Sequence, residues 1–183
     1  MELLMLGLNH KTAPVEVRER FSITKQAVRS GLANLNEYEG LSEAVVLSTC
    51  NRSEIYAVVD DEGKDLPVLK QFLFDLTGNE EDIDEYLYHL ASEECIRHLF
   101  QVASSLDSLV LGEGQILSQV KDAYALGREE GTTSTVLNTL FHRAIATGKR
   151  VRTETRIQYN SVSVSYAAVE LARSEERRVG KEC

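Results

Sequence analysis

The sequence predicts an α+β fold, in which a ferredoxin-like split β-α-β antiparallel sheet is followed by a helical subdomain. In the first half, four short apolar runs and two amphipathic stretches follow one another in the order β-α-β-β-α-β. From residue 92 onward the apolar residues recur at helical spacing only. We therefore assign residues 1–91 to the ferredoxin-like part and residues 92–158 to the helical part of one domain.

The predicted elements of the first half are a strand over 3–9, a helix over 24–40, strands over 42–47 and 54–60, a helix over 66–76 and a strand over 86–90. Pro14 ends the first strand, because proline fixes φ and lacks a backbone N–H. Thr24 is the predicted N-cap of the first helix, and Gly78 is expected to end the second. In this arrangement the helices cover one face of the sheet.

The second half predicts helices over 92–106, 115–128 and 134–152, with Ser92 as the N-cap of the first. Residues 159–173 are expected to begin a linker helix. Residues 174–183 form a charged tail that resembles a cloning remnant, so we exclude them from the fold prediction.

The composition is that of an ordinary globular protein, with 43% hydrophobic and 27% charged residues. No apolar run approaches the roughly 18 residues of a membrane span, so we expect a cytoplasmic location without membrane attachment. The cysteines Cys50, Cys95 and Cys183 lie far apart and form no CxxC pair. We therefore expect reduced thiols and no metal site.

The net charge of −9 opposes a general attraction to nucleic acid, so any RNA contact must be local. One basic segment contains Arg143, Lys149, Arg150, Arg152 and Arg156 against a single acid, Glu154. The alternative interpretation is that this segment is a solvated face of a helix.

Cys50 lies in the segment Ser48-Thr49-Cys50-Asn51-Arg52, between two β-like runs. The segment suits a tight turn, so the thiol is expected at a sheet edge. The guanidinium of Arg52, two residues away, would favour the thiolate, which is the nucleophilic form. The alternative is that Cys50 is a small buried hydrophobic residue, since local sequence fixes neither its exposure nor its partner.

Two features of the helical half could take part in chemistry. His98 lies at the edge of an apolar helix face, where it could serve as an acid or base or simply pack beside the core. Gly112-Glu113-Gly114 precedes a helix but lacks the third glycine and the preceding strand of a dinucleotide fingerprint. Backbone N–H groups there could instead hold a carboxylate or a phosphate.

Together these motifs resemble those of the glutamyl-tRNA reductase family. The resemblance is carried by Gly7-Leu8-Asn9-His10-Lys11-Thr12-Ala13-Pro14, Ser48 to Glu54, His98 to Leu117, Gln119-Val120-Lys121 and Lys149 to Thr155, and it spans residues 7 to about 157. It implies NADPH-dependent reduction of glutamyl-tRNA to glutamate-1-semialdehyde, the first step of 5-aminolevulinate and tetrapyrrole synthesis.

By this resemblance, Cys50 is the nucleophile that forms a glutamyl thioester, which accepts hydride more readily than an oxygen ester does. His98 corresponds to a histidine that contributes to activity, by proton transfer or by orienting the carbonyl. The implied substrate contacts are Thr49, Asn51, Arg52, Ser108, Glu113, Gly114, Gln115 and Gln119. Among them, the planar guanidinium of Arg52 is expected to pair with the glutamate carboxylate.

In the family, the catalytic domain leads into an NADPH-binding domain and a helical dimerisation domain, and neither is found in this sequence. We therefore expect a fragment limited to thioester formation or slow hydrolysis of glutamyl-tRNA, with no cofactor bound. For the complete enzyme the resemblance implies a homodimer that passes its product to glutamate-1-semialdehyde aminomutase. The alternatives are a ferredoxin-like module that binds a small molecule or RNA without chemistry, and a thiol hydrolase, which would need a pair between Cys50 and His98.

Overall fold

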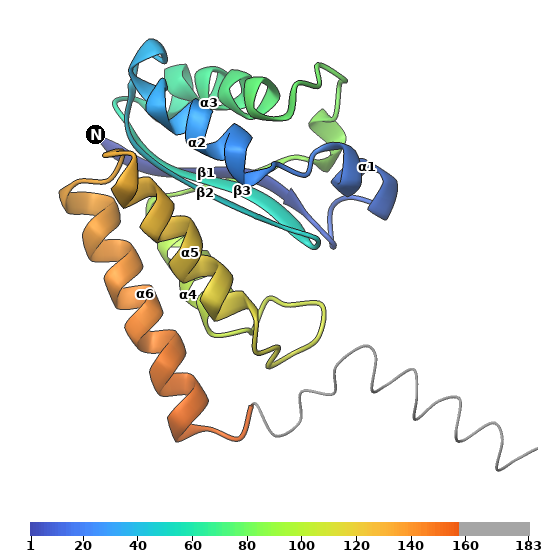
Figure 1. The fold of residues 1–183 in the computed structure, drawn as a ribbon, viewed down its shortest axis with the longest axis vertical. Coiled ribbons are helices and arrows are strands. Elements are labelled where there is room, and N and C mark those ends of the chain that lie inside the picture. Colours follow the sequence, from blue (N-terminus) through green and yellow to red (C-terminus); the bar gives the residue numbers. More distant parts are fainter. Residues whose placement is uncertain (158–183) are drawn as a thin grey trace, which may run out of the picture.

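The computed structural model describes residues 1–157, which form an antiparallel sheet between two layers of helices (Figure 1). The elements in chain order are β1 (Glu2–Asn9), α1 (Val15–Arg20), α2 (Lys25–Ala33), η1 (Leu35–Glu37), β2 (Leu41–Thr49), β3 (Arg52–Val59), α3 (Glu62–Thr77), η2 (Asp84–Tyr86), β4 (Tyr88–Ala91), α4 (Ser92–Ala103), α5 (Ile116–Glu129) and α6 (Thr135–Glu154). The predicted linker helix over 159–173 and the tail over 174–183 lie outside the described residues.

The sheet has the strand order β2-β3-β1-β4 and is antiparallel throughout. This confirms the predicted ferredoxin-like arrangement and makes β2 and β4 the edge strands. In the register, Gly7 of β1 lies opposite Glu54 of β3. A Cβ at Gly7 would clash with the Ser53 carbonyl and with Glu54 itself, so only glycine leaves room for the Glu54 side chain here.

Helices cover both faces of the sheet, whereas the sequence pattern predicted helices on one face. Leu4 and Ile55 pack in the core under α2 and α3, while Met5 and Tyr56 pack in the core with α4, α5 and α6. Figure 1 shows the two helix layers on opposite sides of the strands. A strand between two helix layers needs apolar side chains on both faces, which is why β1 reads as a nearly continuous apolar run.

The ends of two helices follow from local sequence signals. The Thr24 hydroxyl accepts a hydrogen bond from the Ala27 N–H at 3.2 Å, so Thr24 caps α2 as predicted. Asp61 caps α3 through its side chain, and the helix therefore begins at Glu62, earlier than the apolar spacing indicated. Gly78 ends α3 as predicted, with φ at +64°.

Several boundaries differ from the sequence prediction, including the end of α2, which lies at Ala33 and not near residue 40. Pro14 is followed directly by α1, which the sequence reading missed because the fixed φ of proline suits a helix start as well as a strand end. Ser92 is the first residue of α4 and makes no capping bond, since Ala91 occupies the N-cap position. The fourth strand begins at Tyr88 rather than at residue 86, because η2 takes up residues 84–86.

A buried acid of the sheet holds the start of α6. The Glu43 carboxylate accepts hydrogen bonds from the backbone N–H groups of Ser134, Val136 and Leu137 at 2.8, 3.2 and 2.9 Å. The first N–H groups of a helix lack partners within the helix and favour a negative charge. Glu43 therefore fixes where α6 begins against β2.

Two kinds of feature are missing from residues 1–157, membrane spans and clusters of metal ligands. None of the helices in this range combines the length and apolarity that crossing a membrane requires. The same range contains no group of three or more His, Cys, Asp or Glu side chains arranged as metal ligands would be.

Candidate functional site

Cys50 lies in the turn between β2 and β3, and it is exposed. The Thr49 hydroxyl accepts hydrogen bonds from the N–H groups of Asn51 and Arg52, each at 3.2 Å, and so closes the turn. The thiol therefore stands at the end of a hairpin, where the sequence placed it. The alternative of a buried thiol is wrong for Cys50, although it describes Cys95.

Three hydrogen bonds fix the hairpin end to neighbouring loops. Ser48 Oγ accepts from the Ile23 N–H at 3.0 Å. Ser53 Oγ donates to the Phe21 carbonyl at 2.9 Å. The His10 N–H donates to the carbonyl of Asn51, also at 2.9 Å. The turn that carries the thiol is thus held between the loop after β1 and the connection from α1 to α2.

Arg18 of α1 contacts this turn directly. Its Nη1 donates to the Cys50 carbonyl at 2.9 Å and to Asn51 Oδ1 at 3.1 Å. Arg18 was not predicted from the sequence, because a contact across 32 residues leaves no local pattern. A cationic side chain therefore adjoins the reactive turn from outside the motif that contains Cys50.

Arg52 is buried behind the turn, with its side chain 1% exposed. The guanidinium donates to Glu54 Oε1 at 2.7 Å and to Asp107 Oδ2 at 3.1 and 3.2 Å, and also to the Asp107 carbonyl. Two carboxylates therefore balance its charge. This corrects the expectation of a free guanidinium beside Cys50, which local sequence suggested because Asp107 is 55 residues away.

Glu54 lies at the centre of a buried polar network. Its carboxylate accepts hydrogen bonds from the hydroxyls of Tyr56 and Tyr88, both at 2.7 Å, and lies 3.1 Å from His98 Nε2. Burial raises the pKa of Glu54, but the hydrogen bond with His98 and the charge of Arg52 outweigh burial and hold the pKa at about 2. Glu54 is therefore a permanent carboxylate beneath the site.

His98 is buried and faces Glu54, with 8% of its surface exposed. Within residues 1–157 its Nε2 contacts Glu54 and the Tyr88 hydroxyl, and no hydrogen bond joins it to Cys50. It also lines a surface hollow beside β4 and α4. The network connects His98 to the Cys50 turn through Glu54 and Arg52, so the direct thiol–imidazole pair that a thiol hydrolase would need is absent from this range.

Asp107 joins the network to two loops. Its carboxylate contacts Arg52 and forms an ion pair with Lys11 in the loop after β1. Burial raises the pKa of Asp107, yet the hydrogen bond from Lys11 and the charge of Arg52 lower it overall. The neighbouring Ser108 has a buried Oγ that makes no hydrogen bond within residues 1–157. The loop over 104–115 is thus held close to the hairpin that carries Cys50.

The far end of the same loop is held by Arg152 of α6. Arg152 Nη2 donates to the carbonyls of Glu113 and Gly114 at 3.1 and 2.8 Å. Ser105 Oγ donates to the Glu113 carbonyl at 2.8 Å. The loop residues that the sequence predicted as substrate contacts, up to the exposed Gln115, are therefore shaped by the last turn of a distant helix.

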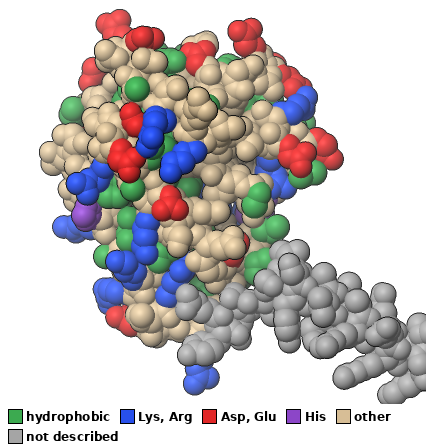
Figure 2. All heavy atoms as spheres, viewed as in Figure 1, with side chains coloured by type: hydrophobic (Ala, Val, Ile, Leu, Met, Phe, Trp, Pro, Cys, Tyr) green, Lys and Arg blue, Asp and Glu red, His purple; other side chains and the backbone are tan. Residues whose placement is uncertain are grey.

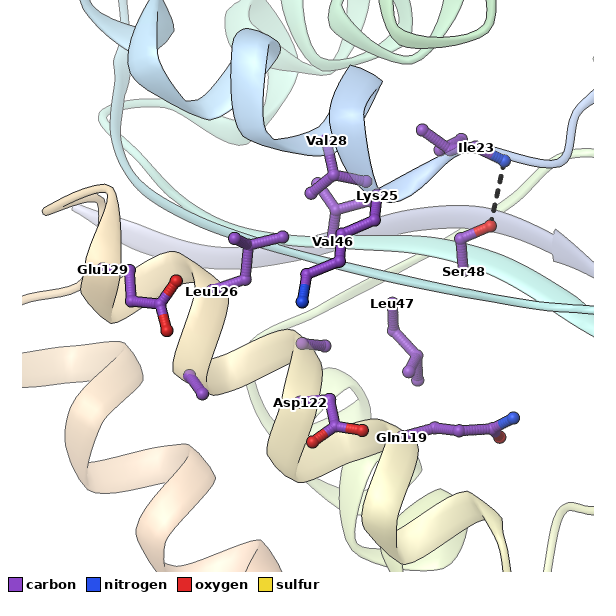
Figure 3. Close-up of a pocket in the computed structure, with 12 residues that line it drawn as sticks. Ile23, Lys25, Val28, Val46, Leu47, Ser48, Gln119, Asp122, Leu126 and Glu129 are labelled. Carbon is purple, nitrogen blue, oxygen red and sulfur yellow. Dashed lines mark hydrogen bonds between the residues drawn. The ribbon is translucent and has the colours of Figure 1, made fainter.

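A groove of about 360 Å³ follows the edge of β2 (Figure 3). Lys25 of α2 lines one side, Gln119 and Asp122 of α5 line the other, and Ser48 lies between them near one end. Gln119 is the predicted substrate contact that lines this groove, and Cys50 is not among its lining residues. The groove therefore adjoins the base of the hairpin rather than the thiol.

The basic segment that the sequence singled out lies mostly on α6. Arg143, Lys149 and Arg150 are exposed, and Arg150 forms an ion pair with Glu154. Arg152 points instead to the loop over 104–115. In the view of Figure 2, Lys and Arg side chains gather on the lower part of the molecule, while many Asp and Glu side chains lie at the top. The charge is therefore unevenly spread, and an RNA contact on α6 stays a prediction.

The structure brings most of the predicted site residues to one end of the sheet. The turn is formed by Thr49, Cys50, Asn51 and Arg52. The contact between Asp107 and Arg52 brings a second set of predicted residues beside the turn, namely Ser108, Glu113, Gly114 and Gln115. Two predicted residues lie elsewhere, with Gln119 in the groove and His98 behind the buried network. Sequence reasoning gave no role to Lys11, Arg18, Glu54, Tyr88 or Asp107. A signal existed for Glu54 alone, as an acid directly before the apolar run Ile55 to Val59.

Comparison with known proteins gives consistent results. Residues 6–155 match the family model described as "Glutamyl-tRNAGlu reductase, N-terminal domain". The chain is 49% identical to glutamyl-tRNA reductase of Moorella thermoacetica over 178 residues, covering 94% of this chain and 40% of the relative. It is also 49% identical to the Brevibacillus brevis protein of that name over 174 residues, covering 94% and 38%. The solved structure of glutamyl-tRNA reductase from Methanopyrus kandleri aligns with a TM-score of 0.74 and 37% identity, covering 94% and 40% of the two chains. The chain thus spans about two fifths of the length of these relatives.

Proposed function

The chain belongs to the glutamyl-tRNA reductase family, and we propose that Cys50 is the nucleophile with which it attacks the ester carbonyl of glutamyl-tRNA. The thiolate sulfur bonds to the carbonyl carbon, the bond from that carbon to the ribose oxygen breaks, and the ribose oxygen takes up a proton. The products are a glutamyl thioester and uncharged tRNA. The observation that carries the proposal is an exposed thiol on a hydrogen-bonded turn inside the matched domain.

We assign the substrate contacts to the turn and to the loop that faces it. Thr49 and Asn51 belong to the turn, and Ser108, Glu113, Gly114 and Gln115 to the loop, with Gln119 in the adjoining groove. The Ser108 hydroxyl supports this assignment, because a buried polar atom without a protein partner suits a hydrogen bond to a ligand. A contact from Arg52 to the glutamate carboxylate stays a prediction, since its guanidinium would have to exchange the acids that now hold it.

We propose that His98 acts on the substrate by proton transfer or by orienting the carbonyl. The carboxylate of Glu54 supports this role, because it fixes the position of the imidazole at Nε2. Since Cys50 and His98 share no hydrogen bond in the described range, His98 would act on the ester or leaving group rather than on the thiol.

Reduction of the thioester by NADPH is proposed for the complete protein and not for these residues. A dinucleotide site needs a strand, a glycine-rich turn and a helix, and here a loop precedes α5. The carbonyls of Glu113 and Gly114 are also tied to Arg152, so the segment does not fit a pyrophosphate cradle. The homodimer, and transfer of the aldehyde to glutamate-1-semialdehyde aminomutase, are likewise proposals for the longer relatives.

The experiment that tests the proposal uses glutamyl-tRNA labelled in the glutamyl group and the 183-residue chain. We expect a thioester adduct in the intact mass, followed by slow release of glutamate to water. Cys50→Ser should abolish the adduct, and Cys183→Ser, a change outside the described residues, should leave it intact. A thioester that persists in the Cys50→Ser variant would exclude this residue as the nucleophile.

A binding module without chemistry is the competing proposal, and thiol reactivity separates the two. A module that only binds a small molecule or RNA should alkylate Cys50 no faster than Cys183 at neutral pH. A nucleophile should alkylate faster at Cys50, which peptide mass spectrometry of the labelled chain would measure.

A further inference from the structure

Two arginines adjoin the Cys50 turn, and their charges are balanced to different degrees. The guanidinium of Arg52 is enclosed and bonded to the carboxylates of Glu54 and Asp107. An arginine between two carboxylates has little positive charge left for a third anion. Arg52 therefore serves the buried network in this conformation.

Arg18 has no such acid partner. Its guanidinium forms no ion pair with any carboxylate in residues 1–157 and uses only Nη1, which donates to the Cys50 carbonyl and to Asn51 Oδ1. Its Nε is buried and makes no hydrogen bond in that range. Nη2 also makes none there. Two donors of the guanidinium are thus uncommitted beside the turn.

Two other cations of the neighbouring segments are already paired within residues 1–157. Lys11 is bonded to Asp107, and Arg20, on the same helix as Arg18, pairs with Glu81 at 2.6 Å. In a chain with a net charge of −9, an unbalanced guanidinium at the reactive turn is a local exception. Such a group attracts an anion that approaches the thiol.

We propose that Arg18 binds an anionic group of the substrate beside the Cys50 turn. This inference rests on the proposed acylation of Cys50. An aminoacyl ester on tRNA brings two kinds of oxyanion close to the attacked carbon: the side-chain carboxylate of the glutamyl group and the phosphate of the terminal nucleotide. The planar fork of an arginine binds either one with two parallel hydrogen bonds.

The first test needs no RNA and compares two alkylating reagents that share a reacting carbon. Iodoacetate is an anion and iodoacetamide is neutral, so the ratio of their rates at Cys50 reports the local attraction for anions. We expect Arg18→Met to lower this ratio by about 3-fold and Arg18→Lys to keep most of it, since surface charge attraction is modest. Arg20→Met removes a guanidinium from the same helix and is the matched control.

A purely structural role for Arg18 predicts a different result. If the side chain only holds the turn through the Cys50 carbonyl, Arg18→Met should slow both reagents equally and leave the ratio unchanged. That outcome would overturn the proposal, whatever happens to acylation.

The second test uses the substrate. In single-turnover acylation by glutamyl-tRNA, Arg18→Met should raise the half-saturating concentration by about 10-fold, as expected for a charge-assisted hydrogen bond, with a smaller change in the maximal rate. Glutamyl-adenosine carries the carboxylate but no phosphate. A loss that persists with this ester identifies the carboxylate, and one that disappears identifies the phosphate.

The outcomes separate the two proposals. If the wild-type chain is acylated and Arg18→Met saturates as the wild type does with both esters, Arg18 does not bind the substrate and the acylation proposal stands. If the wild-type chain is never acylated, the proposed function fails, while the ratio of alkylation rates still decides whether Arg18 attracts anions.

Discussion

Two buried glutamates of neighbouring strands show how the two ends of the sheet differ. Glu43 of β2 is 4% exposed, and within residues 1–157 it accepts hydrogen bonds only from backbone N–H groups at the start of α6. Glu54 of β3 is fully buried and bonds to the side chains of Arg52, Tyr56, Tyr88 and His98. Both carboxylates therefore have hydrogen-bond donors, but the donors are backbone groups for Glu43 and side chains for Glu54.

The kind of partner decides what a buried acid can influence. Backbone N–H groups neither titrate nor change rotamer, so Glu43 can only hold a helix in place. The partners of Glu54 include a titratable imidazole and the arginine that follows the Cys50 turn. Glu54 can therefore transmit charge and position to the candidate site, and Glu43 cannot.

The largest effect that separates the two acids is expected from Glu54→Gln. The change keeps the shape but leaves the buried Arg52 without one of its carboxylate partners and alters the hydrogen bond to His98, so it should lower the free energy of unfolding by about 3–5 kcal/mol. Because Arg52 and His98 are then no longer held in place by a carboxylate, acylation of Cys50 should also slow. Urea unfolding and single-turnover acylation measure the two effects. Acylation at the wild-type rate in this variant would show that Glu54 does not influence the candidate site and so does not differ from Glu43 in that respect.

The pH dependence of stability gives the next largest effect. The pKa of Glu54 in the folded chain is about 2 and its ordinary value is 4.5, so the folded state favours the carboxylate form. This contribution is fully present above pH 4.5, is lost as the pH falls towards 2, and amounts to roughly 3 kcal/mol. Asp107, whose pKa is also lowered, acts in the same direction. Urea unfolding between pH 5 and about 2 should therefore show that the free energy of unfolding falls more steeply with pH in the wild type than in Glu54→Gln.

Glu43→Gln should have a smaller and purely structural effect. The amide oxygen still accepts from Ser134 and Leu137, but the amide NH2 cannot accept from the Val136 N–H, and the negative charge at the helix N-terminus is lost. We expect a loss of about 1–2 kcal/mol in the free energy of unfolding. The rate of Cys50 acylation should stay at the wild-type value, as measured in the same assay. A slower acylation rate would mean that a change at either end of the sheet affects the candidate site.

The smallest effect is expected at the loop over 104–115, which is bonded to Arg52 and Lys11. Arg152→Met removes the donor to the carbonyls of Glu113 and Gly114 and should cost about 1 kcal/mol, with faster amide exchange over 112–115. Arg150→Met is the matched control, because solvent screens its exposed pair with Glu154 and the pair adds little to stability. Equal amide exchange in the two variants would show that Arg152 does not shape the loop.

Local sequence determined much of the fold. The apolar periods gave the β-α-β-β-α-β order, and the Thr24 cap and the Gly78 stop were read correctly because each acts on residues within one helical turn. The same logic placed Cys50 in an exposed turn. It failed at Pro14, where one residue is compatible with two local structures, and at the sheet faces, where a buried strand shows no alternation.

The sequence by itself therefore determined the element order, the family and the position of the thiol, since these depend on neighbouring residues and on motifs. Only the tertiary structure decided that Arg52 is paired with Asp107, that His98 rests on Glu54 and that Arg18 adjoins Cys50. Each of these contacts joins segments 32 to 55 residues apart. Charge balance depends on distance in space, and no spacing along the chain encodes it.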